Sequence, residues 1–121
     1  MAIHYELRQA EPDVTVAALS GQLNLGNRLM EFEHAIKQRI QEGARKMIFD
    51  LSALSYIDSA GLGMVATCAG LMVKSGGKLV VSARGRIMQM FEITRLNQVI
   101  KIYPDFETAL AAISDAKASN A

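Results

Sequence analysis

The sequence predicts an α/β fold in which one mixed β-sheet is backed by about four helices. Half of its 121 residues are hydrophobic, which is enough for one packed core. Apolar residues recur with strand spacing in some segments and with helix spacing in others. Near the middle of the chain a strand, a helix and a second strand follow one another, and this order indicates a parallel, right-handed crossover.

The N-terminal segment is expected to form an antiparallel hairpin at one edge of the sheet. Ile3, Tyr5 and Leu7 alternate with polar residues, which predicts a half-buried strand. A turn at 11–13 leads to a second apolar strand at 14–19. We interpret residues 20–24 as a loop or a short continuation of that second strand.

A helix is predicted from about Gly26 to Glu42, and Gly43 is a plausible stop for it. Four apolar residues share one of its faces: Leu29, Phe32, Ile36 and Ile40. Residues 46–51 then form an apolar run that indicates a buried strand, and we expect a long loop to follow it.

Ser59 is predicted to lie near the N-cap of a helix that runs to about Lys74 and ends at a glycine pair. Two hypotheses remain open for this serine. It could simply cap the helix through a hydrogen bond to a free backbone N–H. The same position would also tolerate an added phosphate, because the N-terminal end of a helix favours negative charge.

The helix after Ser59 is apolar around most of its circumference and carries no charge before Lys74. One face suits packing on a sheet: Leu62, Val65, Ala66, Ala69 and Val73. The other side carries Met64, Thr67, Cys68 and Leu71. Because a short chain has little material with which to bury a helix on every side, we expect this second side to be an exposed docking surface.

Four further elements complete the predicted domain, which spans residues 1–115. They are a strand at 78–82, a short helix at 86–93, a final strand at 99–102 and a closing helix that opens near Pro104. Residues 116–121 are expected to be a short disordered tail.

Composition excludes several classes of protein. Thirteen basic and twelve acidic residues nearly cancel, so we expect no nucleic-acid partner. No apolar run reaches the roughly 18 to 20 residues of a membrane span, and no signal peptide is recognised. The single cysteine, Cys68, fits a cytoplasmic location, and we interpret it as a packing residue.

No enzymatic motif fits the sequence. Residues 61–66 match G-x-G-x-x-A but lack an acidic residue after the next strand, and 75–78 lacks the spacing of a P-loop. Ser59 has no nucleophile elbow, and no histidine follows it in the chain. His4, His34 and Cys68 have no metal-ligand spacing. We therefore expect a non-enzymatic protein without a cofactor or metal.

The motif Asp58-Ser59-Ala60-Gly61-Leu62-Gly63 resembles the D-S-[small]-G-L-G signature of STAS domains, most closely that of bacterial anti-sigma factor antagonists. The resemblance extends over the order of elements from about Ile3 to Asp115. It implies that Ser59 is phosphorylated by a partner anti-sigma factor serine kinase, which binds the ATP-Mg²⁺, and dephosphorylated by a PP2C-type phosphatase.

The resemblance also implies a partner-binding set, which comprises Gln22, Asn24, Asp58, Ser59, Ala60, Gly61, Leu62, Gly63 and Met64. In this set Asp58 engages the kinase or shapes the loop, and Gly61 and Gly63 let the partner approach the backbone. Residues 21–24 depart from the family pattern G-E-[LI]-D, because Gln22 and Asn24 carry amides where the family has carboxylates. A kinase contact that requires the second carboxylate would therefore be altered.

Two functions are compatible with this resemblance. The first is an anti-sigma factor antagonist, monomeric when free, whose unphosphorylated form binds the kinase and releases the kinase's target. The alternative is a non-phosphorylated structural subunit of a larger complex, such as a lipid-transport ATPase. A phosphate on Ser59 would distinguish the first from the second.

Overall fold

The computed structural model describes residues 3–118, with side chains described for residues 3–114. A five-stranded sheet runs in the order β1-β2-β3-β4-β5. Its strands are β1 (His4–Glu11), β2 (Val14–Leu23), β3 (Lys46–Ile57), β4 (Lys78–Ser82) and β5 (Ile102–Tyr103). The helices are α1 (Asn27–Gln41), α2 (Ser59–Lys74), α3 (Gly85–Ile93) and α4 (Phe106–Ala118), with a 3₁₀ turn at Leu96–Gln98.

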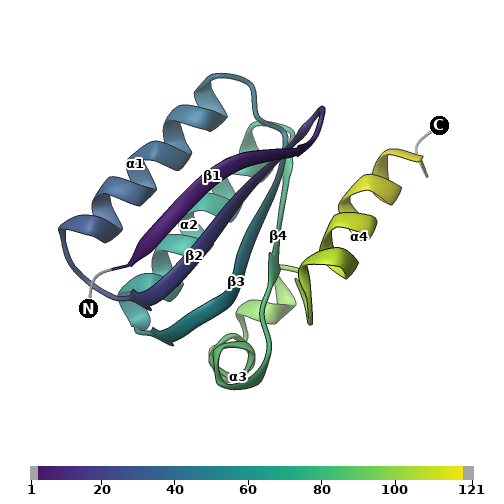
Figure 1. The fold of residues 1–121 in the computed structure, drawn as a ribbon. Helices are drawn as coiled ribbons and strands as arrows, with labels where there is room; N and C mark the ends of the chain where they lie inside the picture. The colour runs from purple at the N-terminus through teal and green to yellow at the C-terminus, as the bar shows by residue number, and fades with distance from the viewer. Residues whose placement is uncertain (1–2, 119–121) are drawn as a thin grey trace.

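Helices cover both faces of the sheet (Figure 1). β1 and β2 form the predicted antiparallel hairpin, and the other neighbouring strands are parallel. α1 and α2 pack on one face together with α3, whereas α4 packs on the other. Side chains alternate between the two layers: Phe49 and Val81 point to the larger core, and Ile48 and Val80 point to α4. The predicted α/β class, with its mixed sheet and four helices, is confirmed.

β3 is longer than predicted and includes residues 52–57, which we had expected to form a loop. The register between β2 and β3 shifts between Ala18 and Ser20 and again between Gly21 and Gln22, so β3 carries extra residues at these points. As a result Leu51, Leu54 and Ile57 all face inward at a spacing of three. That spacing hides the alternation by which strands are recognised in a sequence.

α2 is buried on two sides, which corrects the predicted exposed docking surface. Met64 and Cys68 are 3% and 0% exposed, because α1 packs beside α2 on the same face of the sheet and covers the side that carries them. Of the other two residues predicted on that side, Thr67 is exposed and Leu71 is half-buried. Burial raises the pKa of the Cys68 thiol to about 12, and the Glu33 carboxylate of α1 adds to this rise. The interpretation of Cys68 as a packing residue is thereby confirmed. Val73, which we had assigned to the sheet face, is exposed.

The strand predicted at 99–102 begins later than expected, since β5 comprises only Ile102–Tyr103. Val99 follows the 3₁₀ turn and is exposed, Ile100 is buried, and pairing with β4 begins only at Ile102. α4 continues to Ala118, and residues 119–121 of the predicted tail lie outside the described residues. Among residues 3–118, no helix is both long and apolar enough to cross a lipid bilayer.

Candidate functional site

The C-terminal ends of β2 and β3 bring residues 22–25 and 56–59 to one edge of the sheet. The parallel register pairs Gln22 with Tyr56 and Leu23 with Ile57. The backbone N–H of Asp58 then donates to the carbonyl oxygen of Leu23 at 3.1 Å. The predicted motif therefore begins where β3 ends, directly beside the loop that leaves β2.

Ser59 lies next to the N-cap as predicted, but the cap itself is Asp58, so the hypothesis that Ser59 caps α2 is wrong. The Oδ1 atom of Asp58 accepts a hydrogen bond from the N–H of Gly61 at 2.8 Å. Its Oδ2 atom accepts another from the N–H of Leu25 at 3.1 Å. The carboxylate thus satisfies a free donor of the first helical turn and also fixes the loop after β2 against the start of α2.

Ser59 is the first residue of α2, and its side chain is exposed. Within the part of the chain that the structure describes, its hydroxyl makes no hydrogen bond, because Asp58 already serves as the cap. Two other hydroxyls near the site are engaged. Ser55 donates to the carbonyl of Gly21 at 3.0 Å, and Thr67 donates to the carbonyl of Gly63 at 2.9 Å.

The two glycines of the motif have different surroundings. Gly61 is buried, and a Cβ atom there would lie 2.5 Å from the carbonyl oxygen of Leu23 and 2.9 Å from Ile57. Its lack of a side chain lets α2 start close to β2, so Gly61 serves internal packing and does not face a partner. Gly63 is exposed, with no heavy atom within 4 Å of such a Cβ atom, so its backbone is open to close approach.

The other predicted partner-binding residues differ in accessibility. Leu62 and Met64 are buried in the core, so their side chains do not lie on the surface as a direct contact requires. Ala60 is half-buried. Gln22 and Asn24 are also half-buried at the end of β2, where the Asn24 amide donates to Oε1 of Gln22 at 3.4 Å.

A groove beside Ser59, which sequence reasoning missed, separates the motif from α3. Its volume is about 460 Å³, and it is lined by Tyr56, Ile57, Asp58, Ser59, Arg86, Ile87, Gln89, Met90 and Ile93. Tyr56 and Ile93 are 49% and 75% exposed although both are large apolar side chains. We had predicted Tyr56 in a loop and assigned no role to Ile93, because only the fold brings β3 and α3 together.

We call the surface formed by Leu25, Tyr56, Ser59, Gly63 and Ile93 the Ser59 face. Leu25 does not line the groove, but its N–H binds the Asp58 carboxylate, and its side chain is 76% exposed. Exposed apolar side chains thus lie close to the start of α2, an arrangement typical of a surface that another protein covers.

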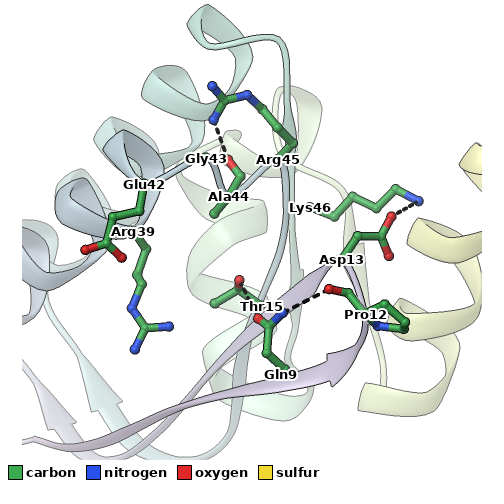
Figure 2. A pocket seen from close by; sticks show the side chains of 10 residues that line it. All are labelled: Gln9, Pro12, Asp13, Thr15, Arg39, Glu42, Gly43, Ala44, Arg45 and Lys46. Carbon is green, nitrogen blue, oxygen red and sulfur yellow. Dashed lines mark hydrogen bonds and ion pairs between the residues drawn. The ribbon is translucent and has the colours of Figure 1, made fainter.

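A larger hollow, of about 570 Å³, lies at the opposite end of the parallel strands (Figure 2). It is formed where β2 and β3 begin, since Val14 pairs with Lys46 there. Several of its polar groups bind one another: Lys46 forms an ion pair with Asp13 at 3.4 Å, and Arg45 donates to the carbonyl of Ala44 at 2.7 Å. Within residues 3–118, no three His, Cys, Asp or Glu side chains are grouped to hold a metal ion.

Comparisons with known proteins agree with this fold and motif. Residues 7–109 match the model of the STAS domain, so the chain belongs to the STAS domain family. Its similarity extends to anti-sigma factor antagonists. The chain is 29% identical over 102 residues to the putative anti-sigma factor antagonist BtrV of Bordetella bronchiseptica, covering 84% of this chain and 87% of that one.

Two further relatives carry the same designation. The anti-sigma-B factor antagonist of Staphylococcus aureus is 32% identical over 73 residues, which cover 60% of this chain and 68% of that protein. The crystal structure of an anti-sigma factor antagonist from Mycobacterium paratuberculosis superposes with a TM-score of 0.82 at 25% identity, covering 93% and 95% of the two chains.

The capping role of Asp58 leads to a stability prediction. Replacing it in Asp58→Ala removes the bond to Gly61 and the bond to Leu25, and should lower the free energy of unfolding by about 1 to 2 kcal/mol. Asp58→Asn is the matched control: its amide oxygen still accepts from Gly61, but its NH2 group cannot accept from Leu25, so it should lose less stability than Asp58→Ala. Urea denaturation measures both variants, and an Asp58→Ala protein as stable as the wild type would contradict the assigned cap.

Proposed function

We propose that this protein is an anti-sigma factor antagonist that works by partner switching in the bacterial cytoplasm. Its unphosphorylated, monomeric form binds an anti-sigma factor serine kinase, and the kinase then releases the sigma factor or other target that it holds. Phosphorylation of Ser59 blocks this binding, and a PP2C-type phosphatase restores it. The STAS domain and the names of the relatives support the class of function.

The exposed, unbonded hydroxyl of Ser59 is the observation that carries the phosphorylation site. Because Asp58 caps α2, phosphate can be added to Ser59 without breaking a hydrogen bond within the described residues. The kinase would transfer the γ-phosphoryl group of ATP to the Ser59 Oγ atom and accept the hydroxyl proton on a base of its own, leaving ADP. The phosphatase would use water to release inorganic phosphate.

The Ser59 face supplies the docking surface in this proposal. Leu25, Tyr56 and Ile93 offer apolar area around the serine, and such area drives most protein association. Gly63, one turn further along α2, leaves its backbone open, so a partner's chain can approach closely. The kinase therefore covers this face in the unphosphorylated complex, whereas α1 and the sheet already bury the large side chains Leu62, Met64 and Met72 of α2.

The experiment is phosphorylation by the serine kinase that co-purifies with the protein from its native extract. With ATP and Mg²⁺ we expect one phosphate by intact mass, and none on Ser59→Ala. Ser55→Ala and Thr67→Ala are the matched controls, because both hydroxyls already donate to backbone carbonyls, and both variants should still accept one phosphate.

Phosphate added to Ser59→Ala would refute Ser59 as the acceptor. A constant complex with an ATPase, in which Ser59 stays unmodified, would instead support the structural-subunit alternative.

A further inference from the structure

Arg86 and Ser59 line the same groove although they come from different elements. Ser59 opens α2, and Arg86 is the second residue of α3. Arg86 is exposed and, within the described residues, makes no hydrogen bond or ion pair. Within residues 3–118, neither the Arg86 guanidinium nor the Ser59 hydroxyl has a hydrogen-bond partner, and both line one cavity, so an anion added there would have an arginine available to bind it.

The charges of the groove favour that role. Its ionisable lining residues are Tyr56, Asp58 and Arg86, so Arg86 is the one cation among them. The Asp58 carboxylate is held by the N–H groups of Gly61 and Leu25 and stays at the start of α2. A phosphate on Ser59 would therefore stand next to a fixed negative charge, and the guanidinium of Arg86 offers the nearest compensation in the groove.

From this geometry we propose that Arg86 binds the phosphate of phosphorylated Ser59 and holds it in the groove between β3 and α3. The proposal rests on the proposed function and adds which side chain stabilises the protein phosphorylated on Ser59. A guanidinium binds phosphate through paired N–H donors, which fixes the group in position. The phosphate then occupies the space between Tyr56 and Ile93, so it covers apolar surface that the partner contacts in the unmodified state.

The test uses the full chain with phosphoserine inserted at position 59 during translation, so that no kinase is needed. A ³¹P NMR titration measures the second pKa of the phosphate, which is about 6 in the absence of neighbours. Arg86 favours the dianion and should hold this pKa lower in the wild type than in Arg86→Gln, by a few tenths of a unit and up to about 0.7. Salt at about 1 M should remove most of the difference.

Arg84→Gln is the matched control, because Arg84 carries the same charge and lies two residues before Arg86 but does not line the groove. It should leave the phosphate pKa at the wild-type value, and Arg86→Lys should restore part of the shift. Equal pKa values in Arg86→Gln and the wild type would overturn the proposal. So would an Arg86 Nε–H resonance that does not move when Ser59 carries phosphate.

These outcomes are separable from failure of the proposed function. If no kinase modifies Ser59, the proposed switch fails, while the inserted phosphoserine still reports whether Arg86 binds it. If the kinase modifies Ser59 but Arg86→Gln leaves the phosphate pKa unchanged, only the role of Arg86 is lost. Thermal melts of each variant confirm that the fold is kept, as expected for an exposed side chain.

Discussion

Phosphorylation of Ser59 should weaken binding of the anti-sigma factor kinase more than a hundredfold. The modification adds about −1.5 to −2 charges and three acceptor oxygens at the centre of the Ser59 face. Leu25, Tyr56 and Ile93 contribute exposed apolar area to this face, and that area has to lose its water when the partner docks. A loss of only about 3 kcal/mol of docking energy corresponds to more than a factor of one hundred in affinity.

Two substitutions separate this effect from any change in stability. Ser59→Ala should alter the free energy of unfolding by less than about 0.5 kcal/mol, since Asp58 is the cap and the serine hydroxyl has no partner among the described residues. Ser59→Ala should bind the kinase at least as well as the unphosphorylated wild type does. Ser59→Asp places an acid in the first turn of α2, which the helix dipole favours by about 0.3 to 1 kcal/mol.

Affinity and stability should therefore move in opposite directions in Ser59→Asp. Isothermal titration calorimetry measures the affinity for the kinase, and thermal melts measure the stability. The carboxylate carries less charge and bulk than phosphate, so its effect should be smaller than that of the modification itself. Equal affinities of Ser59→Ala, Ser59→Asp and the phosphorylated protein would contradict the switch.

The sequence predicted where the motif lies, but it did not predict which of its residues caps α2. Aspartate and serine both cap helices well, and they are adjacent at positions 58 and 59. Propensity alone does not choose between them. The choice is made by tertiary structure: the Asp58 carboxylate reaches the N–H of Leu25 in the loop after β2 as well as that of Gly61. Among residues 3–118, the Ser59 hydroxyl is thereby left without a hydrogen bond.

The groove could not be derived from the sequence for a related reason. Tyr56 and Ile93 are 37 positions apart, and only the packing of α3 beside the end of β3 brings them to one cavity. The irregular register of β3 also concealed that Tyr56 belongs to a strand. By contrast, the hairpin and the parallel pairing of the strands before and after the Ser59 helix follow from local apolar periodicity, and the structure shows both where they were predicted.

The nearly all-apolar character of α2 was recognised, but the element that buries its second side was not. Periodicity shows that a helix has two apolar sides without showing what covers each. In the fold α1 lies over the side that carries Met64 and Cys68, whose sulfur atoms are 3.7 Å apart. The exposed surface of α2 is consequently a strip that includes Ser59, Gly63, Thr67 and Gly70 and ends in Val73 and Lys74.

Met64→Glu should therefore unfold the protein or lower its free energy of unfolding by at least about 3 kcal/mol. Met64 is 3% exposed in the layer between α1 and α2, and among the described residues its contacts belong to the hydrophobic core. A carboxylate there loses its hydration inside the hydrophobic core, which costs several kcal/mol even when the group takes up a proton. Urea denaturation followed by circular dichroism measures the loss.

Two control variants test whether the loss of stability comes from burying a charge at position 64. Val73→Glu places the same charge on the same helix at a side chain that is 70% exposed, and it should change the stability by less than about 0.5 kcal/mol. Met64→Leu keeps the apolar volume and should cost less than about 1.5 kcal/mol. If Met64→Glu were as stable as Val73→Glu, α1 would not cover this side of α2, and the side would again be available to a partner. The predicted order of stability, with Met64→Glu far below the other two, thus tests which part of α2 is left for docking.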